Sequence, residues 1–307
     1  MALLNARKDL SLGKRMKNEW NRNTIVYIFM IPILIHFIIF QAYPLVYSFI
    51  LTFMDWSPVG SSDFVGLDNW IRFLNDDLAW RAIWNTILFT IYFVVPTMAL
   101  GLIFAIVVNS GIKMAGFFKG VFFLPVVTSF VIVAGIWNWV FQGNENGMVN
   151  YLLGLMGIDP QLFLSSSTQA LIVLAGLSIF KVSGQMMIYY FAGLKSIPPE
   201  LYEAARIDGA SPWKSFWTIT MPLLKPFHFY VAIITTISSF QIFDSTYLLT
   251  NGGPENSTVT VVYYLYQQGF ESIDLSYASV IAYALFAIIF TISLIQRKYL
   301  GGEVNHY

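Results

Sequence analysis

The chain has 307 residues, of which 57% are hydrophobic and only 11% are charged. Soluble domains carry about 25% charged residues, so this composition argues against a soluble enzyme and excludes a disordered chain. Basic and acidic residues balance at 17 each, which gives no electrostatic indication of a nucleic-acid partner. Cysteine is absent, which excludes disulfides, thiolate metal sites and cysteine nucleophiles.

Long apolar segments dominate the chain, and a membrane-spanning helix needs about 20 mostly apolar residues. The first segment is too long for a signal-peptide core and has no small-residue cleavage site behind it, so we expect it to be retained. The sequence predicts an all-α membrane protein with six transmembrane helices, at Ile25–Phe53, Ala82–Val108, Gly116–Phe141, Ala170–Leu194, Phe227–Leu249 and Tyr277–Ile295.

Basic residues are distributed unevenly between the connecting segments. Most of them lie in two tails, 1–24 and 297–307, and in the connections after the second and fourth helices. The positive-inside rule places these segments, and with them both termini, in the cytoplasm. The opposite connections carry only Arg72 and Arg81 as basic residues, and they are rich in acidic side chains such as Asp76.

The sequence offers no motif for chemistry on this chain. No phosphate-binding loop of the form G-x-x-x-x-G-K-[ST] occurs, so we expect no ATP site here. The three histidines are scattered without metal-ligand spacing, so we expect no metal site. A membrane-embedded enzyme is disfavoured because no cluster of catalytic groups lies at one depth.

The connection 196–226 carries helix start and stop signals. Pro198 and Pro199 suit the first turn of a helix, and Gly209 suits its left-handed end. Ser211 and Pro212 then predict a second short helix, which we expect to reach Thr220 and to be broken at Pro222. In the first helix, we expect a small apolar stripe at Leu201, Ala204 and Ala205. Two short helices joined by a tight turn indicate a docking element rather than a plain loop.

The run Glu203 to Ala210 matches E-A-A-x-x-D-G-A and resembles the EAA loop of ABC importer permeases. The resemblance implies a type I ABC importer permease fold, in which this loop is the coupling helix that contacts a separate ATPase. ATP and Mg²⁺ would then bind to partner ATPase subunits, and this chain would hold no cofactor. The residues implied in that contact are Glu203, Ala204, Ala205, Asp208, Gly209 and Ala210, with Glu203 and Gly209 foremost.

A second segment, FQIFDSTYLLTNGGP at 240–254, resembles carbohydrate-uptake permeases, including the larger permease subunit of maltose importers. The resemblance covers most of 82–296, which is expected to form the transmembrane domain. It implies a bacterial or archaeal inner-membrane protein that acts with a homologous second permease, two ATPase subunits and an extracytoplasmic solute-binding protein. Glycerol phosphate and charged oligosaccharides remain alternative cargoes. The large outer domain of the maltose subunit is absent from this sequence.

Two charged residues lie inside predicted helices, where each costs about 2.5–3.5 kcal/mol. Lys181 and Asp244 either line the translocation path, or Lys181 forms a buried pair with Asp244 or with a partner subunit. An alternative class, a self-sufficient secondary transporter or channel, would use both as an ion or proton site.

Neutral polar side chains suit sugar hydroxyls, although hydrogen bonds between helices are the commoner role of such residues in membranes. Gln241 aligns with sugar-binding amides of the maltose subunit, and Val182 and Gln185 fall near its helix-four contacts. Trp137, Trp139, Tyr247 and Tyr283 are interpreted as packing or interface anchors. The remaining pathway candidates are Asn138, Ser178 and Ser239.

Overall fold

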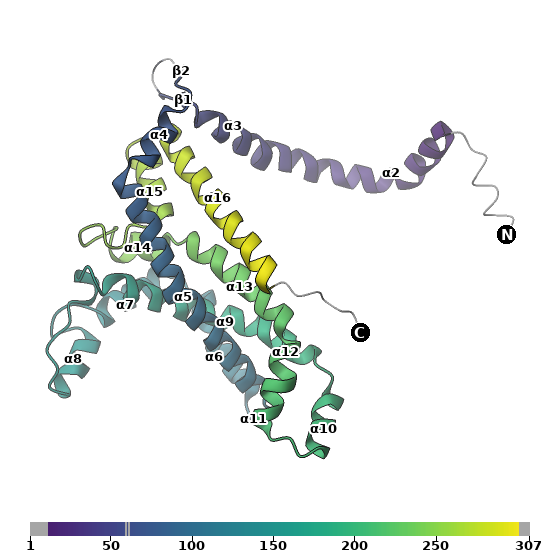
Figure 1. The fold of residues 1–307 in the computed structure, drawn as a ribbon, viewed down its shortest axis with the longest axis vertical. Coiled ribbons are helices and arrows are strands. Elements are labelled where there is room, and N and C mark those ends of the chain that lie inside the picture. The colour runs from purple at the N-terminus through teal and green to yellow at the C-terminus, as the bar shows by residue number, and fades with distance from the viewer. Residues whose placement is uncertain (1–11, 59, 61, 301–307) are drawn as a thin grey trace.

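The computed structural model describes residues 12–58, 60 and 62–300 (Figure 1). The two predicted cytoplasmic tails include residues 1–11 and 301–307, which lie outside the described residues, so the predictions for these positions are not addressed by the structure. The elements before the central bundle are α2 (Leu12–Phe37), the π-helical turn η1 (Ile38–Ala42), α3 (Tyr43–Leu51), β1 (Met54–Asp55), β2 (Asp63–Phe64) and α4 (Asp68–Leu74). Next come α5 (Asp77–Asn109), α6 (Ala115–Val127), α7 (Phe130–Val140), α8 (Met148–Leu155), the 3-10 turn η2 (Phe163–Ser165) and α9 (Ala170–Ser196).

The second half of the chain contains the short helices of the 196–226 connection and the last spans. Its elements are α10 (Pro199–Ile207), α11 (Pro212–Ser215), the π-helical turn η3 (Phe216–Thr220), α12 (Met221–Leu223), α13 (Lys225–Phe240), α14 (Asp244–Leu249), α15 (Val261–Tyr266), the π-helical turn η4 (Gln267–Glu271) and α16 (Leu275–Leu300).

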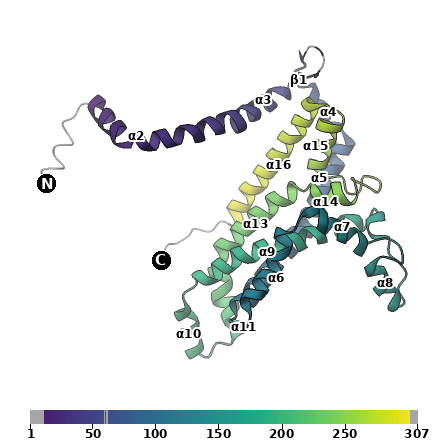
Figure 2. The same cartoon turned by 180° about the vertical axis from the view of Figure 1, so that it is seen from behind.

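The first helix stands apart from the rest of the molecule. α2, η1 and α3 form one long rod that leaves the bundle, and its apolar part is Val26–Leu51 (Figures 1 and 2). None of its most apolar window is buried. It joins the bundle at α16, where the Tyr283 hydroxyl donates to the Leu45 carbonyl at 2.6 Å. Helix begins at Leu12, inside the segment predicted to be a tail.

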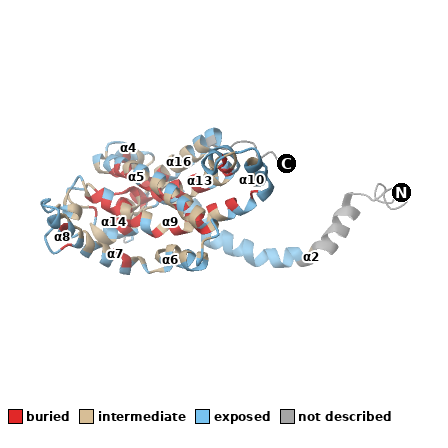
Figure 3. Ribbon diagram, turned by 90° about the horizontal axis from the view of Figure 1, so that it is seen from below, coloured by how far each residue is buried: buried red, intermediate tan, exposed pale blue. Residues whose placement is uncertain are grey.

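The core of the bundle lies between α5 and α9, with α13 packed against α5. Buried residues gather along these three helices in Figure 3, while α2 is exposed over its described side chains. α6 approaches α9 so closely at Gly184 that a Cβ there would lie 2.0 Å from the Phe122 carbonyl oxygen. Small residues permit such approach between membrane helices, where packing replaces the hydrophobic effect as the driving force.

Two of the six predicted spans are broken. Among the described residues, four helices are long and apolar enough to cross a membrane, and the number rises to six if each of two bent pairs is one span. The predicted span Gly116–Phe141 divides into α6 and α7 with a bend of 94°, at Thr128 and Ser129. The predicted span Phe227–Leu249 ends at Phe240 and restarts as α14.

The second bend lies close to a predicted break, but not at it. α11 to α12 meet α13 at 65°, and the bend falls at Leu224 rather than at Pro222. Pro222 is accommodated in the first turn of α12, where its missing N–H costs little.

Candidate functional site

The short helix α10 ends in the left-handed turn that its sequence predicts. Gly209 has φ +74°. The amide of Ala210 donates to the Ala205 carbonyl at 2.8 Å, and the amide of Gly209 donates to the Arg206 carbonyl at 3.1 Å. These two bonds form a Schellman motif, which closes the helix end and needs a residue that tolerates positive φ.

α11 begins at the cap expected from Ser211 and Pro212. The Ser211 hydroxyl accepts a hydrogen bond from the Lys214 amide at 3.2 Å, and Pro212 occupies the first helical position. The turn between α10 and α11 is therefore fixed by backbone bonds on the α10 side and by the Ser211 side chain on the α11 side. The protruding segment 199–215, made of α10, this turn and α11, is called the knob below.

The motif residues of this knob lie mostly on its surface. Glu203, Ala204, Asp208 and Gly209 are exposed, whereas Ala205 and Ala210 are partly buried. The apolar stripe predicted at Leu201, Ala204 and Ala205 does not pack as a unit. Tyr202 faces inward instead, because its hydroxyl bonds to the Thr220 hydroxyl at 2.9 Å and sets the rotation of α10.

Large apolar side chains surround the exposed motif. Ile207 is 87% exposed, Trp213 70% and Trp217 51%. α10 and α11 form part of the wall of an open pocket of about 490 Å³, which α5 and α9 also line. Tryptophan and aliphatic side chains in a group are typical of protein interfaces. Figure 1 places this surface at the end of the molecule opposite α4.

Lys181 fills the break between α6 and α7. Its ammonium donates to the carbonyls of Pro125 at 2.7 Å, Val126 at 3.4 Å and Thr128. A helix that stops inside a membrane leaves its last carbonyls without amide donors, and a cation at that end satisfies both the carbonyls and the helix dipole. No ion pair joins Lys181 to Asp244 among the described residues, so a direct contact between these two side chains, one of the expected alternatives, is not formed.

The other pathway candidates differ in what remains free for a ligand. Gln241 and Asp244 are exposed at the break between α13 and α14, and Asn138 is exposed on α7. Gln185 is partly buried and donates to the Tyr189 hydroxyl at 3.1 Å. Val182, also partly buried, packs among the core residues of α9.

Two serines predicted as pathway candidates are used within the bundle. The Ser178 hydroxyl donates to the Leu174 carbonyl at 3.1 Å in its own helix. Ser239 is fully buried, donates to the Thr236 carbonyl at 2.7 Å and lies 2.9 Å from the Thr90 hydroxyl on α5. The Ser239 contact with Thr90 is the hydrogen bond between helices that was the alternative for these residues, whereas the Ser178 bond stays within its own helix.

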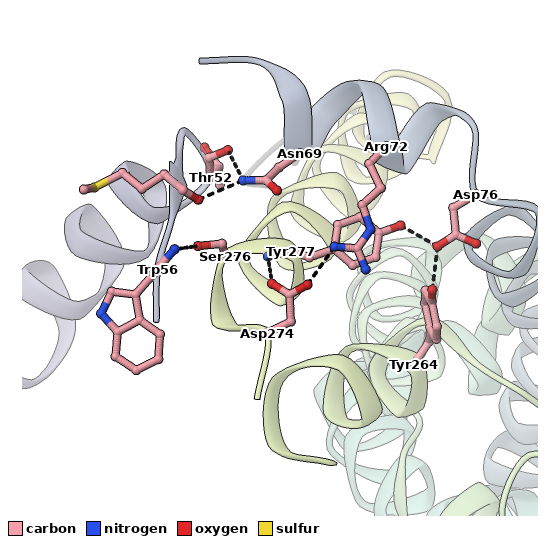
Figure 4. A network of polar contacts seen from close by, with 10 residues as sticks. Thr52, Trp56, Asn69, Arg72, Asp76, Tyr264, Asp274, Ser276 and Tyr277 are labelled. Atoms are coloured by element: carbon pink, nitrogen blue, oxygen red, sulfur yellow. Dashed lines mark hydrogen bonds and ion pairs between the residues drawn. The ribbon is translucent and has the colours of Figure 1, made fainter. Parts of the chain in front are cut away.

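A polar network at the α4 end of the molecule was not anticipated (Figure 4). Asp76 caps α5 by accepting from the amides of Leu78 at 2.9 Å and Ala79 at 3.2 Å. Its second oxygen accepts from the hydroxyls of Tyr264 and Tyr277, each at 2.5 Å. The only sequence signal was the capping preference of an Asp before an apolar run, because the tyrosines lie almost two hundred residues away.

The same network continues to a surface ion pair. The Arg72 guanidinium lies 3.8 Å from the centre of the Tyr277 ring and bonds Asp274 at 2.7 Å. Burial acts to raise the pKa of Asp76, but the hydrogen bonds from Tyr264, Tyr277 and the two amides outweigh it and hold that pKa below its ordinary value of 3.8. Asp76 therefore stays ionised and joins α5, α15 and α16.

Within the described residues, no group of three or more His, Asp and Glu side chains is placed to hold a metal ion. The groups that gather are structural caps and hydrogen-bonded tyrosines.

Comparison with known proteins gives one consistent result. Residues 97–299 match the family described as binding-protein-dependent transport system inner membrane component. The arabinooligosaccharides transport system permease protein AraP of Bacillus subtilis (strain 168) is 34% identical over 285 residues, which cover 92% of this chain and 90% of that protein. The sn-glycerol-3-phosphate transport system permease protein UgpA of Escherichia coli is 29% identical over 282 residues, 91% of this chain and 95% of that protein.

Solved structures show the same fold. A chain of a bacterial ABC transporter involved in the import of the acidic polysaccharide alginate has a TM-score of 0.82 at 23% identity, covering 95% of this chain and all of that one. A chain of the bacterial alginate ABC transporter in complex with an alginate pentasaccharide-bound periplasmic protein has a TM-score of 0.81, covering 92% of this chain and 96% of that one.

Proposed function

The chain belongs to the family of inner-membrane components of binding-protein-dependent transport systems, and from this premise we propose that it is one of two permease subunits of an ATP-driven carbohydrate importer. The observation that carries the proposal is the exposed, doubly capped loop that contains Glu203 and Gly209. A rigid knob with exposed tryptophans is suited to seat in a groove of an ATPase subunit.

The charge distribution supports a cytoplasmic position for this knob and for both termini. Lys195, Arg206, Lys214 and Lys225 lie in or beside the connection between α9 and α13. The opposite end, at α4, carries Arg72 and Arg81. By the positive-inside rule, α10 then faces the cytoplasm and the Asp76 network faces outward.

The uncovered first helix supports a second membrane subunit. α2 to α3 have apolar side chains exposed along their described length, and α6 and α7 are exposed over much of their surface. Lipid covers part of this area, and a homologous permease facing α7 and α13 encloses the path. Polar groups left free at that level, Gln241, Asp244 and Asn138, are the proposed cargo contacts.

The cargo class follows from the names of the relatives. They transport arabinooligosaccharides and sn-glycerol-3-phosphate, and the solved neighbours belong to an alginate importer. A polyhydroxylated substrate fits amide and hydroxyl groups on the path. An extracytoplasmic binding protein delivers it to the Asp76 end of the molecule.

Transport follows a rigid-body switch. ATP and Mg²⁺ bind the partner ATPases, whose closure moves the α10–α11 knob of each permease. The broken spans at Lys181 and at Leu224 lie between the knob and the path, so they pass this movement to the residues beside Gln241. The chain itself performs no covalent step.

A self-sufficient transporter that uses Lys181 and Asp244 has less support. The Lys181 ammonium is engaged by three backbone carbonyls, and breaking these bonds in each cycle would leave the end of α6 unpaired. That mechanism also leaves the exposed EAA knob without a role.

The proposal is tested by reversing the charge of Glu203 in the complex isolated from the host membrane. We expect Glu203→Lys to insert and to retain the second permease, but to lose uptake and binding-protein-stimulated ATP hydrolysis. Glu200→Lys, in the first turn of the same helix and equally exposed, is the matched control and should retain most of the activity. Wild-type uptake by Glu203→Lys, or a chain that purifies without an ATPase, would contradict the proposal.

A further inference from the structure

Four aromatic side chains form a continuous row between the break after α13 and the start of α16. The Phe243 ring lies 5.2 Å from Tyr247 and 5.1 Å from Tyr266, centre to centre. Tyr247 and Tyr266 are 5.6 Å apart, and Tyr266 stacks on Phe270 at 5.6 Å. Phe243 lies just before α14, and α14, α15 and η4 contribute the other three rings, so separate elements build one row.

The row is open at one side rather than sealed in the core. Phe270 is 69% exposed and Tyr247 39% exposed, whereas Phe243 and Tyr266 are partly buried. Phe270 is held out by the π-helical turn η4, a backbone irregularity that often marks functional positions. The interpretation of Tyr247 as a packing anchor therefore accounts for only part of its surface.

The row is continuous with the proposed cargo contacts. Its inner end, Phe243, directly precedes the exposed Asp244 and lies two residues after the exposed Gln241. Its outer end, Phe270, directly precedes the exposed Glu271. With the orientation proposed above, the row leads from the outer surface to the level of Gln241.

The charges beside the row disfavour an acidic cargo. Asp244 and Glu271 stand at its two ends, while the two arginines of that end of the molecule are engaged elsewhere. Arg72 bonds Asp274, and Arg81 donates to the Glu255 carbonyl at 3.1 Å. Lys181 is occupied by the end of α6. A uronic acid chain would therefore meet repulsion without a compensating cation.

We propose that Phe243, Tyr247, Tyr266 and Phe270 form an outer relay platform that stacks the C–H faces of a neutral oligosaccharide on its way to the membrane path. Flat aromatic faces supply apolar contact and a negative quadrupole to sugar C–H groups, and ring spacings of 5.1 to 5.6 Å are close to the length of one pyranose unit. This inference rests on the proposed function for the direction of transport, but not for the binding itself.

The test measures binding directly, in the complete complex reconstituted in nanodiscs. Saturation-transfer NMR is recorded with two neutral probes, arabinotriose and maltotriose, and with one acidic probe, trigalacturonate. We expect transfer to the ring C–H protons of at least one neutral probe and several-fold less to trigalacturonate. The double variant Tyr247→Leu, Phe270→Leu keeps apolar bulk but removes the flat faces, and should weaken binding about tenfold.

A matched control separates stacking from general loss of aromatic surface. Phe286 and Phe290 stack at 5.9 Å on α16 and are 62% and 53% exposed. Leu at both positions should leave transfer unchanged. Equal transfer to trigalacturonate, or undiminished transfer in the Tyr247 and Phe270 variant, would overturn the proposal.

Two further outcomes distinguish a failure of the relay platform from a failure of the proposed importer function. If the Leu variant loses the second permease during purification, the row is a subunit interface and the relay is wrong. If the wild-type complex binds the neutral probe but contains no ATPase, the relay stands and the importer function fails.

Discussion

At the scale of single residues, Lys181 shows how a charge inside a membrane bundle acquires a structural role. Its side chain spans from α9 to the end of α6 and donates to three carbonyls that no amide reaches. The sequence shows the cost of this charge but leaves open whether Lys181 lines the path or forms a buried pair, with Asp244 or with a partner subunit. The backbone partner became visible only when α6 was seen to stop at Val127.

Replacement of Lys181 by Met leaves these carbonyls without a donor in an apolar environment. We expect the free energy of unfolding to fall by about 2–4 kcal/mol, measured as a lower thermal unfolding temperature of the purified complex. Lys195→Met, at the exposed end of the same helix, should change it little. An undiminished stability combined with loss of uptake would instead assign Lys181 to the cargo path.

Asp76 gives a pH-dependent contribution to stability. Because the pKa of Asp76 is lower in the folded chain than its ordinary value of 3.8, its contribution is complete above that value and is lost as the pH falls through the folded pKa. We expect Asp76→Asn to be less stable than the wild type by about 1–2 kcal/mol near pH 7. Thermal unfolding between pH 7 and pH 3 should show this difference shrinking at the acid end.

The neighbouring acid supplies the comparison for Asp76. Asp77 is exposed in the first turn of α5 and is not part of the tyrosine network. The difference in thermal unfolding temperature between Asp77→Asn and the wild type should stay constant across the same pH range. If the difference in unfolding temperature between Asp76→Asn and the wild type is also constant with pH, the hydrogen bonds from Tyr264 and Tyr277 do not stabilise the fold.

At the scale of elements, the broken helix α6–α7 depends on a close crossing with α9. Gly184→Ala places a methyl group 2.0 Å from the Phe122 carbonyl oxygen, so α6 must move away from α9. We expect a loss of about 1–3 kcal/mol in unfolding free energy, detected by thermal unfolding. Gly176→Ala in the same helix meets Trp137 at 3.6 Å, an ordinary contact, and should be neutral.

The crossing of α6 with α9 at Gly184 should also affect transport if the broken span α6–α7 transmits the movement of the knob. Gly184→Ala should then lower coupled uptake more than Gly176→Ala at equal expression. Equal stability of the two variants would show that α6 is not held at this crossing.

At the scale of the whole molecule, the apolar surface of the first helix is not covered by the rest of this chain, so we expect lipid or another subunit to contact it. Because the sequence contains no cysteine, single substitutions give clean labelling sites. Ile33→Cys, on a residue 69% exposed in α2, should resist a water-soluble maleimide in intact membranes. A membrane-permeant photoreactive thiol reagent at this position should yield an adduct with the second permease.

The control for Ile33 lies outside the membrane. Phe64→Cys, on β2 and 77% exposed, should react with the water-soluble reagent and give no such adduct. Adducts of Ile33→Cys with lipid alone would show that α2 faces only the bilayer.

By itself, the sequence determined the membrane class, the positions of the apolar segments and the local form of the connection between α9 and α13. These properties depend on composition and on short-range capping at Gly209 and Ser211, so a few neighbouring residues suffice to specify them. The tertiary structure alone decided where spans break, what Lys181 bonds, and how Asp76 meets Tyr264 and Tyr277. Those features join residues 53 to 201 positions apart, and only packing of the complete bundle brings such groups together.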